Sequence, residues 1–274
     1  MWGSGLKTWT DGSTAYVSAV FSWQLQQAYQ RAVWYKSSGY HVRVGGPAVT
    51  LGPQMWDGVA EVGGTVDALP HHNQDATFTT RGCIRNCQFC AVPVLEGGLV
   101  ELDEWRPAPT ICDNNLLAAS WKHFSNVIDR LKSAGVRRVD FNQGLDARLI
   151  EKEHAQRISE LDLYAVRLAW DDTRTENSFR SAVSTLISSG VPKSKIRVYI
   201  LIGYKDTPAD ALYRLETAGG LVGYTNPMRY QPLDAKKRNS YVAPGWSDRE
   251  LKRYMRYWSM KRFFGSIPFS EYVG

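Results

Sequence analysis

Three of the four cysteines of this chain, Cys83, Cys87 and Cys90, lie within eight residues of one another. The spacing Cys-x3-Cys-x2-Cys places three thiols on one short loop, which can wrap a single metal centre. Three thiolates can hold three irons of a cubane iron-sulfur cluster and leave the fourth iron open to a small molecule. Such clusters reach potentials as low as about −700 mV, at which an electron can be transferred into a sulfonium bond.

A structural zinc site is the alternative, because zinc is held by cysteines two to four residues apart, with a fourth ligand closing the tetrahedron. Cys112, His71 or His72 can supply that ligand. Zinc sites usually contain two separated cysteine pairs, whereas this loop holds a triplet with Phe89 before its last cysteine. The pattern favours the cluster, and a zinc-binding, non-catalytic nucleic-acid module is the competing class of protein.

The composition, 43% hydrophobic and 22% charged over 274 residues, is that of a folded globular protein. The net charge of +6 lies partly in the tail at residues 236–262, so a nucleic-acid partner is an option, although a solvated surface explains so small an excess. The longest apolar runs, such as residues 198–202, are too short to cross a bilayer, and residues 1–10 lack the apolar core of a secretion signal. Few, clustered cysteines predict a reducing, cytoplasmic setting without membrane association.

Apolar periodicity predicts an alternation of helices and strands. An amphipathic helix is expected at residues 18–38 and a buried strand at 40–44, followed by a linker over 61–75. Beyond the linker, strands are expected at 76–80, 109–113, 138–142, 165–170, 196–202 and 221–224, and helices at 115–134, 150–161, 176–189 and 208–218.

This alternation predicts an α/β fold with a parallel sheet, since parallel neighbours need crossovers of this size and right-handed crossovers curl the sheet. We expect a partial (β/α)6 TIM-like barrel over residues 75–230. A short α/β segment (1–70) precedes it, and a basic, aromatic, helical extension (231–274) follows. The active site of such a sheet lies at the carboxyl ends of its strands.

The cysteine triplet with Phe89 before its last member, directly after a predicted strand, resembles the signature of the radical S-adenosylmethionine (SAM) superfamily. The resemblance covers residues 75–230 and agrees with that superfamily's six-fold partial barrel. It implies that Cys83, Cys87 and Cys90 bind a four-iron four-sulfur cluster, that SAM chelates the free iron, and that Phe89 lies near the adenine. The implied reaction is reductive cleavage of SAM to methionine and a 5′-deoxyadenosyl radical, which abstracts a substrate hydrogen atom. A small electron donor such as flavodoxin or ferredoxin is the implied partner.

Polar residues after the second and third predicted strands are candidates for binding SAM. Asp113 and Asn114 stand where the superfamily often has a Gly-Gly-Glu motif for the SAM amino group. They can accept from an ammonium group, or form an Asx turn and cap the following helix. The amides of Asn142 and Gln143 can bind the ribose or the methionine carboxylate.

Two further candidates lie on the fourth and fifth strands. Arg167 is a charge within an apolar run and needs a partner, which is either a SAM carboxylate or substrate anion, or Asp140 or Asp171 in an ion pair. Ile202 and Gly203 resemble the superfamily's fifth-strand segment, whose backbone packs on adenine.

The Asp-Asn pattern and the segment Arg43-Val44-Gly45-Gly46-Pro47 resemble the subgroup that carries a cobalamin-binding domain. Residues 1–70 are about half the length of a complete domain of that type. The Asp-x-His-x-x-Gly motif that ligates cobalamin is absent from the sequence, and His41 lies in another context. The segment is therefore interpreted as a truncated or degenerate remnant, and cobalamin is not expected as a cofactor.

The reaction outcome stays open at the level of the sequence. A tRNA-modifying methylthiotransferase-like enzyme and a cobalamin-dependent methyltransferase-like enzyme are the alternatives within the superfamily. The sequence holds no second cysteine triplet for an auxiliary cluster, which argues against the first of them.

Overall fold

The chain forms two compact units in the computed structural model, which describes residues 5–63, 68–260 and 267–273. The first unit comprises Met1–Ala76 and Gln231–Tyr241, and the second comprises Thr77–Tyr230 and Val242–Gly274. The expected extension at 231–274 thus divides between the units. Its α-helix within the described residues is α9 (Asp248–Ser259), and the basic positions 261 and 262 lie outside them.

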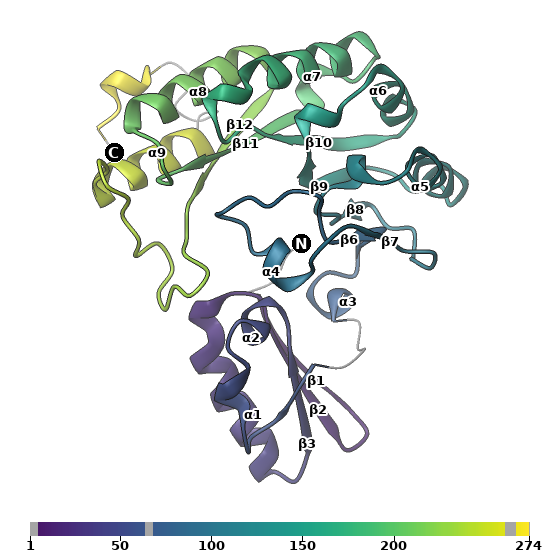
Figure 1. Ribbon diagram of the computed structural model, residues 1–274, viewed down its shortest axis with the longest axis vertical. Helices are drawn as coiled ribbons and strands as arrows, with labels where there is room; N and C mark the ends of the chain where they lie inside the picture. The colour runs from purple at the N-terminus through teal and green to yellow at the C-terminus, as the bar shows by residue number, and fades with distance from the viewer. Residues whose placement is uncertain (1–4, 64–67, 261–266, 274) are drawn as a thin grey trace. The chain divides into compact units, whose positions relative to one another are not determined.

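The first unit is built on a four-stranded sheet in the order β1-β2-β3-β4 (Figure 1). Strands β1 and β2 pair antiparallel, whereas β2 with β3 and β3 with β4 pair parallel. The strands are β1 (Leu6–Asp11), β2 (Thr14–Ala19), β3 (His41–Gly45) and β4 (Glu61–Val62). The helices are α1 (Leu25–Ser37), α2 (Pro47–Thr50) and α3 (Leu69–His72), with 3₁₀ turns at Ser22–Gln24 and Pro53–Trp56.

The β1–β2 hairpin and the start of α1 correct the prediction for this unit. The helix expected from residue 18 begins at Leu25, because Ser18 and Ala19 still belong to β2. The available signal was the Asp11-Gly12 pair, since Gly12 turns the hairpin with a φ of 54° that glycine adopts without strain. The linker expected at 61–75 contains β4 and α3, and its residues 64–67 lie outside the described ones.

The core of this unit lies between the sheet and α1. Buried side chains of β2 and β3 pack against Ala28 and Ala32 of α1 and against Trp56. His72, a candidate zinc ligand by sequence, is buried in this unit, and its Nε2 lies 2.9 Å from the Ser18 hydroxyl. Burial lowers the pKa of His72, and the charge of Lys7 lowers it further. The exposed His71 stacks on Trp9 instead.

The second unit contains a six-stranded sheet whose neighbours follow the order of the chain, β5-β8-β9-β10-β11-β12. The pairs from β8 to β12 are parallel, which confirms the predicted α/β class. The strands are β5 (Ala76–Thr77), β8 (Thr110–Ile111), β9 (Val139–Leu145), β10 (Leu163–Ala169), β11 (Ile196–Ile202) and β12 (Tyr224–Arg229).

Helices α5 to α8 connect successive strands and lie along one side of this sheet (Figure 1). Their bounds are α5 (Trp121–Ser133), α6 (Lys152–Ser159), α7 (Glu176–Ser188) and α8 (Pro208–Leu221). Single 3₁₀ turns lie at Leu116–Ala118, Ala147–Leu149, Thr173–Thr175, Lys193–Lys195 and Phe269–Glu271. Consecutive order with helices on one side is the arrangement that right-handed crossovers produce.

The last predicted strand was misplaced. Residues 221–224 were expected to form it, but α8 runs through Gly219 and Gly220 to Leu221, and β12 starts only at Tyr224. Pro227 lies within β12, and a proline weakens the sequence signal for a strand because it cannot donate to a sheet. Strand β12 lies at an edge of the sheet, where proline is tolerated.

The strand predicted at 76–80 is two short strands. Thr77 lies in β5, whereas β6 (Thr80–Arg81) pairs antiparallel with β7 (Val100–Glu101) in a separate ribbon. The cysteine loop therefore leaves from this ribbon and not directly from the large sheet. The short helix α4 (Val92–Leu95) follows the loop.

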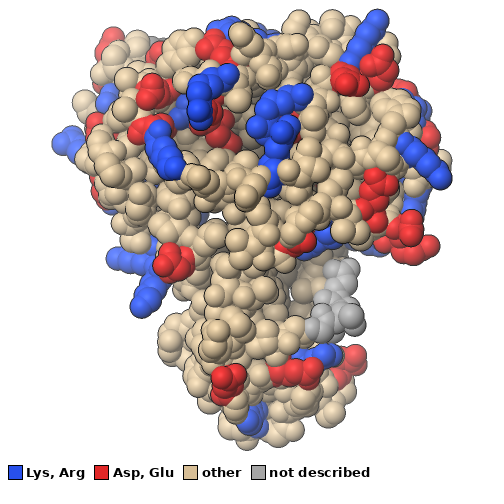
Figure 2. All heavy atoms as spheres, in the orientation of Figure 1, with Lys and Arg blue, Asp and Glu red and all other residues tan. Residues whose placement is uncertain are grey.

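No helix among the described residues is long and apolar enough to cross a membrane. On the face shown in Figure 2, basic and acidic side chains are interspersed and do not separate into regions of one sign.

Candidate functional site

A cavity of about 1120 Å³ lies at the carboxyl ends of the parallel strands in the second unit. Its wall includes the cysteine loop and the segments that follow β8, β9, β10 and β11. Carboxyl ends of parallel strands meet at one edge of a sheet, so the chain's polar strand ends converge here. Among the predicted site residues, those that line the cavity are Cys83, Cys87, Phe89, Cys90, Asn114 and Gln143.

The three loop cysteines are free, half-buried thiols that open onto this cavity. The Cys90 amide donates to the Cys87 carbonyl at 2.9 Å, which closes a turn between them. Burial raises the pKa of Cys87 and of Cys90, and the charges of neighbouring cysteines add to this shift. Metal binding must therefore displace protons from these two sulfurs at neutral pH.

The donor set of the cavity fits a group held by three thiolates. The lining residues include no histidine and no fourth cysteine among those the structure describes. Cys112, a candidate fourth zinc ligand by sequence, is a fully buried core thiol outside the cavity lining, and its Sγ lies 3.7 Å from the Thr110 carbonyl oxygen. Within residues 5–63, 68–260 and 267–273, no three His, Cys, Asp or Glu side chains are arranged to hold a metal ion. The match between this cavity and a group held by three thiolates therefore rests on the number and chemical kind of the donors, and not on their arrangement.

A tight backbone approach fixes the start of the cysteine loop. Gly82 has a φ of 72°, and a Cβ there would lie 2.0 Å from the Gly98 carbonyl oxygen, so only glycine fits. Its amide donates to Glu96 at 2.8 Å, and the Cys83 amide donates to the Gly97 carbonyl at 3.2 Å. The two amides that lead into Cys83 are therefore both held by the segment that follows α4.

The connection after β8 binds the cysteine loop with successive residues. The buried Asp113 accepts from the amides of Thr79 and Thr80 at 2.6 and 2.9 Å, and from the Thr79 hydroxyl. Burial raises the pKa of Asp113, and these hydrogen bonds oppose the rise. The predicted helix cap is wrong, because α5 is capped by Ser120, whose hydroxyl accepts from His123.

The two asparagines of this connection also contact residues in or next to the cysteine loop. Asn114 donates to Glu96 at 2.9 Å, the carboxylate that also holds Gly82. Asn115, which was not among the predicted site residues, places its Nδ2 3.6 Å from the Cys83 sulfur. Three consecutive residues of the connection thus contact the strand that leads into the loop, the carboxylate that holds Gly82, and the sulfur of Cys83.

Arg167 forms an ion pair with Asp140, one of the two arrangements predicted for it. Two guanidinium nitrogens lie 2.7 and 2.5 Å from the two carboxylate oxygens, and a third donates to the Tyr199 hydroxyl. Burial lowers the pKa of Arg167, but the hydrogen bond and charge of Asp140 outweigh it and raise the pKa overall. Arg167 is not among the described residues that line the cavity.

The remaining predicted residues lie at or behind the wall. Phe89 packs edge-to-face on Tyr204, with ring centroids 5.4 Å apart. The backbone carbonyl of Asn142 accepts a hydrogen bond from the Tyr199 hydroxyl, 3.3 Å away. Ile202 and Gly203 are buried, and the fifth strand contributes Leu201 and Tyr204 to the cavity instead.

An arginine pair on the wall was missed at the level of the sequence. Asp146 accepts from Arg85 at 2.8 Å and from Arg148 at 2.7 Å, and all three residues line the cavity. Although burial raises the pKa of Asp146, the hydrogen bonds from Arg148 and Arg85 outweigh it and lower the pKa. One carboxylate shared by two guanidinium groups leaves a net positive charge beside the cysteine loop.

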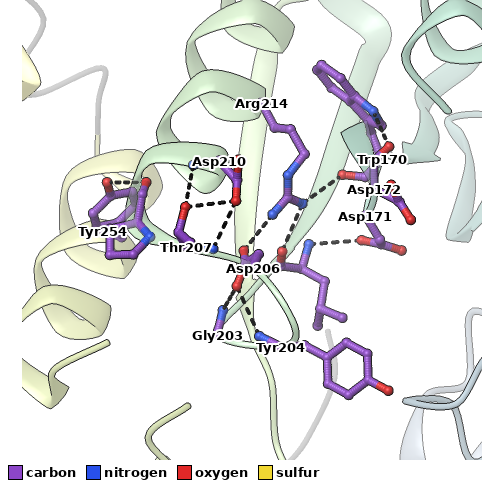
Figure 3. A network of polar contacts seen from close by, with 12 residues as sticks. Trp170, Asp171, Asp172, Gly203, Tyr204, Asp206, Thr207, Asp210, Arg214 and Tyr254 are labelled. Atoms are coloured by element: carbon purple, nitrogen blue, oxygen red, sulfur yellow. Dashed lines mark hydrogen bonds and ion pairs between the residues drawn. The ribbon is translucent and has the colours of Figure 1, made fainter. Parts of the chain in front are cut away.

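Two carboxylates after β10 and β11 complete the wall (Figure 3). Asp171 accepts from the Leu201 amide at 2.9 Å, and burial raises its pKa. Asp206 is bound by the fully buried Arg214, which donates to it at 2.6 Å and also to the carbonyls of Trp170 and Leu201. The sequence signal was the position of Arg214 in α8, where it shares the buried face with Ala211, Leu215 and Ala218.

No protein-family model matches the chain, and no curated protein is significantly similar to it.

Proposed function

We propose that the chain is a radical SAM enzyme, in which Cys83, Cys87 and Cys90 bind a four-iron four-sulfur cluster. The observation that supports this best is the set of three thiols on one cavity, with no histidine and no fourth cysteine among its described lining residues. Structural zinc sites are typically closed by a fourth cysteine or histidine, whereas a cluster that binds a small molecule is held by three thiolates. The cluster would supply an electron that cleaves SAM to methionine and a 5′-deoxyadenosyl radical.

The size of the cavity supports a cofactor and a substrate bound together. Ligand cavities range over about 300–1,000 Å³, and this cavity of about 1120 Å³ is slightly larger than that range. The consecutive parallel sheet is the arrangement expected of a partial barrel, and we include that architecture in the proposal.

The chain's own residues supply binding and orientation. Glu96 holds the Gly82 amide at the start of the cysteine loop, and Asp113 holds the Thr79 amide just before β6. Phe89 offers an aromatic edge on the cavity wall, and Asp171 offers a carboxylate oxygen that the Leu201 amide does not occupy. Arg85 and Arg148 supply guanidinium groups on the cavity wall, which can bind an anionic group of SAM or of a substrate.

Anaerobic reconstitution with iron and sulfide, followed by reduction with SAM, tests the proposal. We expect about four irons and four sulfides per chain, charge-transfer colour, and release of 5′-deoxyadenosine and methionine. Cys87→Ala should abolish colour and cleavage, because it removes one of three thiolates. Cys112→Ala is the matched control and should keep both, since Cys112 is buried away from the cavity lining.

A colourless protein with one zinc would refute the proposal and support the zinc-binding module. A cluster that forms without releasing 5′-deoxyadenosine would refute the radical chemistry alone.

A further inference from the structure

The sulfur of Cys83 receives two N–H groups from different parts of the chain. The Arg85 amide, within the cysteine loop, lies 3.3 Å from Sγ. The Asn115 side-chain amide lies 3.6 Å from the same sulfur and comes from the connection after β8. The first contact follows from the local turn, whereas the second needs a separate element to bring a side chain to the sulfur.

Asn115 is buried in a way that a structural role does not explain. Only 1% of its surface is exposed, and its Oδ1 has no hydrogen-bond partner among the described residues. A neutral thiol is a weak acceptor, so the contact with Cys83 compensates little for burying the amide. A thiolate bound to iron carries negative charge and makes the same contact a charge-assisted hydrogen bond. The amide is therefore matched to the metal-bound form of Cys83.

We propose that Asn115 is a positioning residue that directs its N–H at the Cys83 sulfur and thereby sets the reduction potential of the cluster. This inference rests on the proposed function. Hydrogen bonds to cluster sulfurs are one of the factors that set the potential, because they stabilise the more negatively charged, reduced state. Asn115 should therefore raise the potential relative to a protein that lacks this donor.

Redox titration of the reconstituted protein, followed by electron paramagnetic resonance of the reduced cluster, tests this role. Asn115→Leu keeps the volume and removes the N–H, and should lower the reduction equilibrium constant up to tenfold, which is about 59 mV for a one-electron couple. Asn115→Asp is a second variant of the same shape. It replaces the donor with a carboxylate oxygen and should lower the potential at least as far.

Asn114→Ala is the matched control. It removes an amide from the same connection, but that amide donates to Glu96 and not to a sulfur. Its potential should shift less than that of either Asn115 variant, because no donor to a sulfur is lost. Iron content and circular dichroism of each variant establish that cluster and fold are retained.

Three results would overturn the inference, and they can be told apart. A reconstituted unmodified protein without a cluster would refute the proposed function and the role of Asn115 together. A normal cluster whose potential is the same in both Asn115 variants would refute the role of Asn115 and leave the proposed function standing. A shift of equal size in Asn114→Ala would assign the effect to the loop as a whole.

Discussion

Replacing Arg214 with methionine should destabilise the second unit by removing the buried cation that ties α8 to the cavity wall. The Arg214 side chain is 1% exposed and donates to Asp206 at 2.6 Å. It also donates to the carbonyls of Leu201 at 2.9 Å and Trp170 at 3.2 Å (Figure 3). Methionine fills much of the same space without a donor, so the variant tests the polar contacts and not the volume.

The expected loss in the free energy of unfolding is about 3 kcal/mol. Removing one partner of a buried ion pair costs about 3–5 kcal/mol, because the other charge stays buried. We expect the low end because Asp206 keeps other donors, the amides of Gly203 and Tyr204 and the indole of Trp246. A double-mutant cycle with Asp206→Asn should give a coupling energy of about 1–3 kcal/mol.

The loss should also depend on pH. Burial raises the pKa of Asp206 and Arg214 lowers it, so the pKa of this carboxyl should rise further in the variant. A carboxyl whose folded pKa is raised stabilises the fold below its unfolded pKa, and that contribution is lost as the pH rises through the folded pKa. The difference between the two proteins should therefore grow as the pH rises above 3.8, the ordinary value for this group.

Urea unfolding at a series of pH values measures both effects. A loss below about 1 kcal/mol at neutral pH would be typical of an exposed pair and would refute the reasoning. A loss independent of pH would show that the carbonyl contacts, and not the carboxylate, account for the stabilisation.

Two further predictions concern the cavity wall. Alkylation of the metal-free protein near neutral pH, followed by peptide mass spectrometry, should label Cys83, Cys87 and Cys90. Cys112 should stay unmodified until the chain unfolds, because burial raises its pKa to about 12. Equal labelling of all four would contradict the buried position of Cys112. Asp146→Asn should cost about 1–3 kcal/mol at neutral pH by removing the charge that binds two arginines. Since the pKa of Asp146 is lowered, this cost should shrink as the pH falls below the ordinary value of 3.8, and a constant cost in thermal unfolding across that range would contradict the ion pairs.

The buried strands of the second unit could be predicted because a short, continuous apolar run is typical of a strand buried on both faces. Strand β11 occupies residues 196–202 as expected, and β10 differs from the expected range by one or two residues. The β1–β2 hairpin was missed. In β2 the buried Ala15, Val17 and Ala19 alternate with their neighbours, but two of these three are alanine, which is a poor strand former. Burial of His72 could not be predicted either, since it depends on Ser18, 54 positions away.

The segment 112–115 shows why the strand ends were harder to assign than the cysteines. Its sequence offers a thiol, a carboxylate and two amides, and each can bind a ligand, cap a helix or hold another loop. Only the arrangement of β6, β7 and β8 decides among these roles. It directs Asp113 to the amides of Thr79 and Thr80, and Asn114 to the Glu96 carboxylate. These two residues therefore influence any bound group indirectly, by fixing where the cysteine loop lies. Asn115 alone of the four reaches a thiol of the triplet among the described contacts. It is therefore the residue of this connection that can act directly on a group bound by the cysteines.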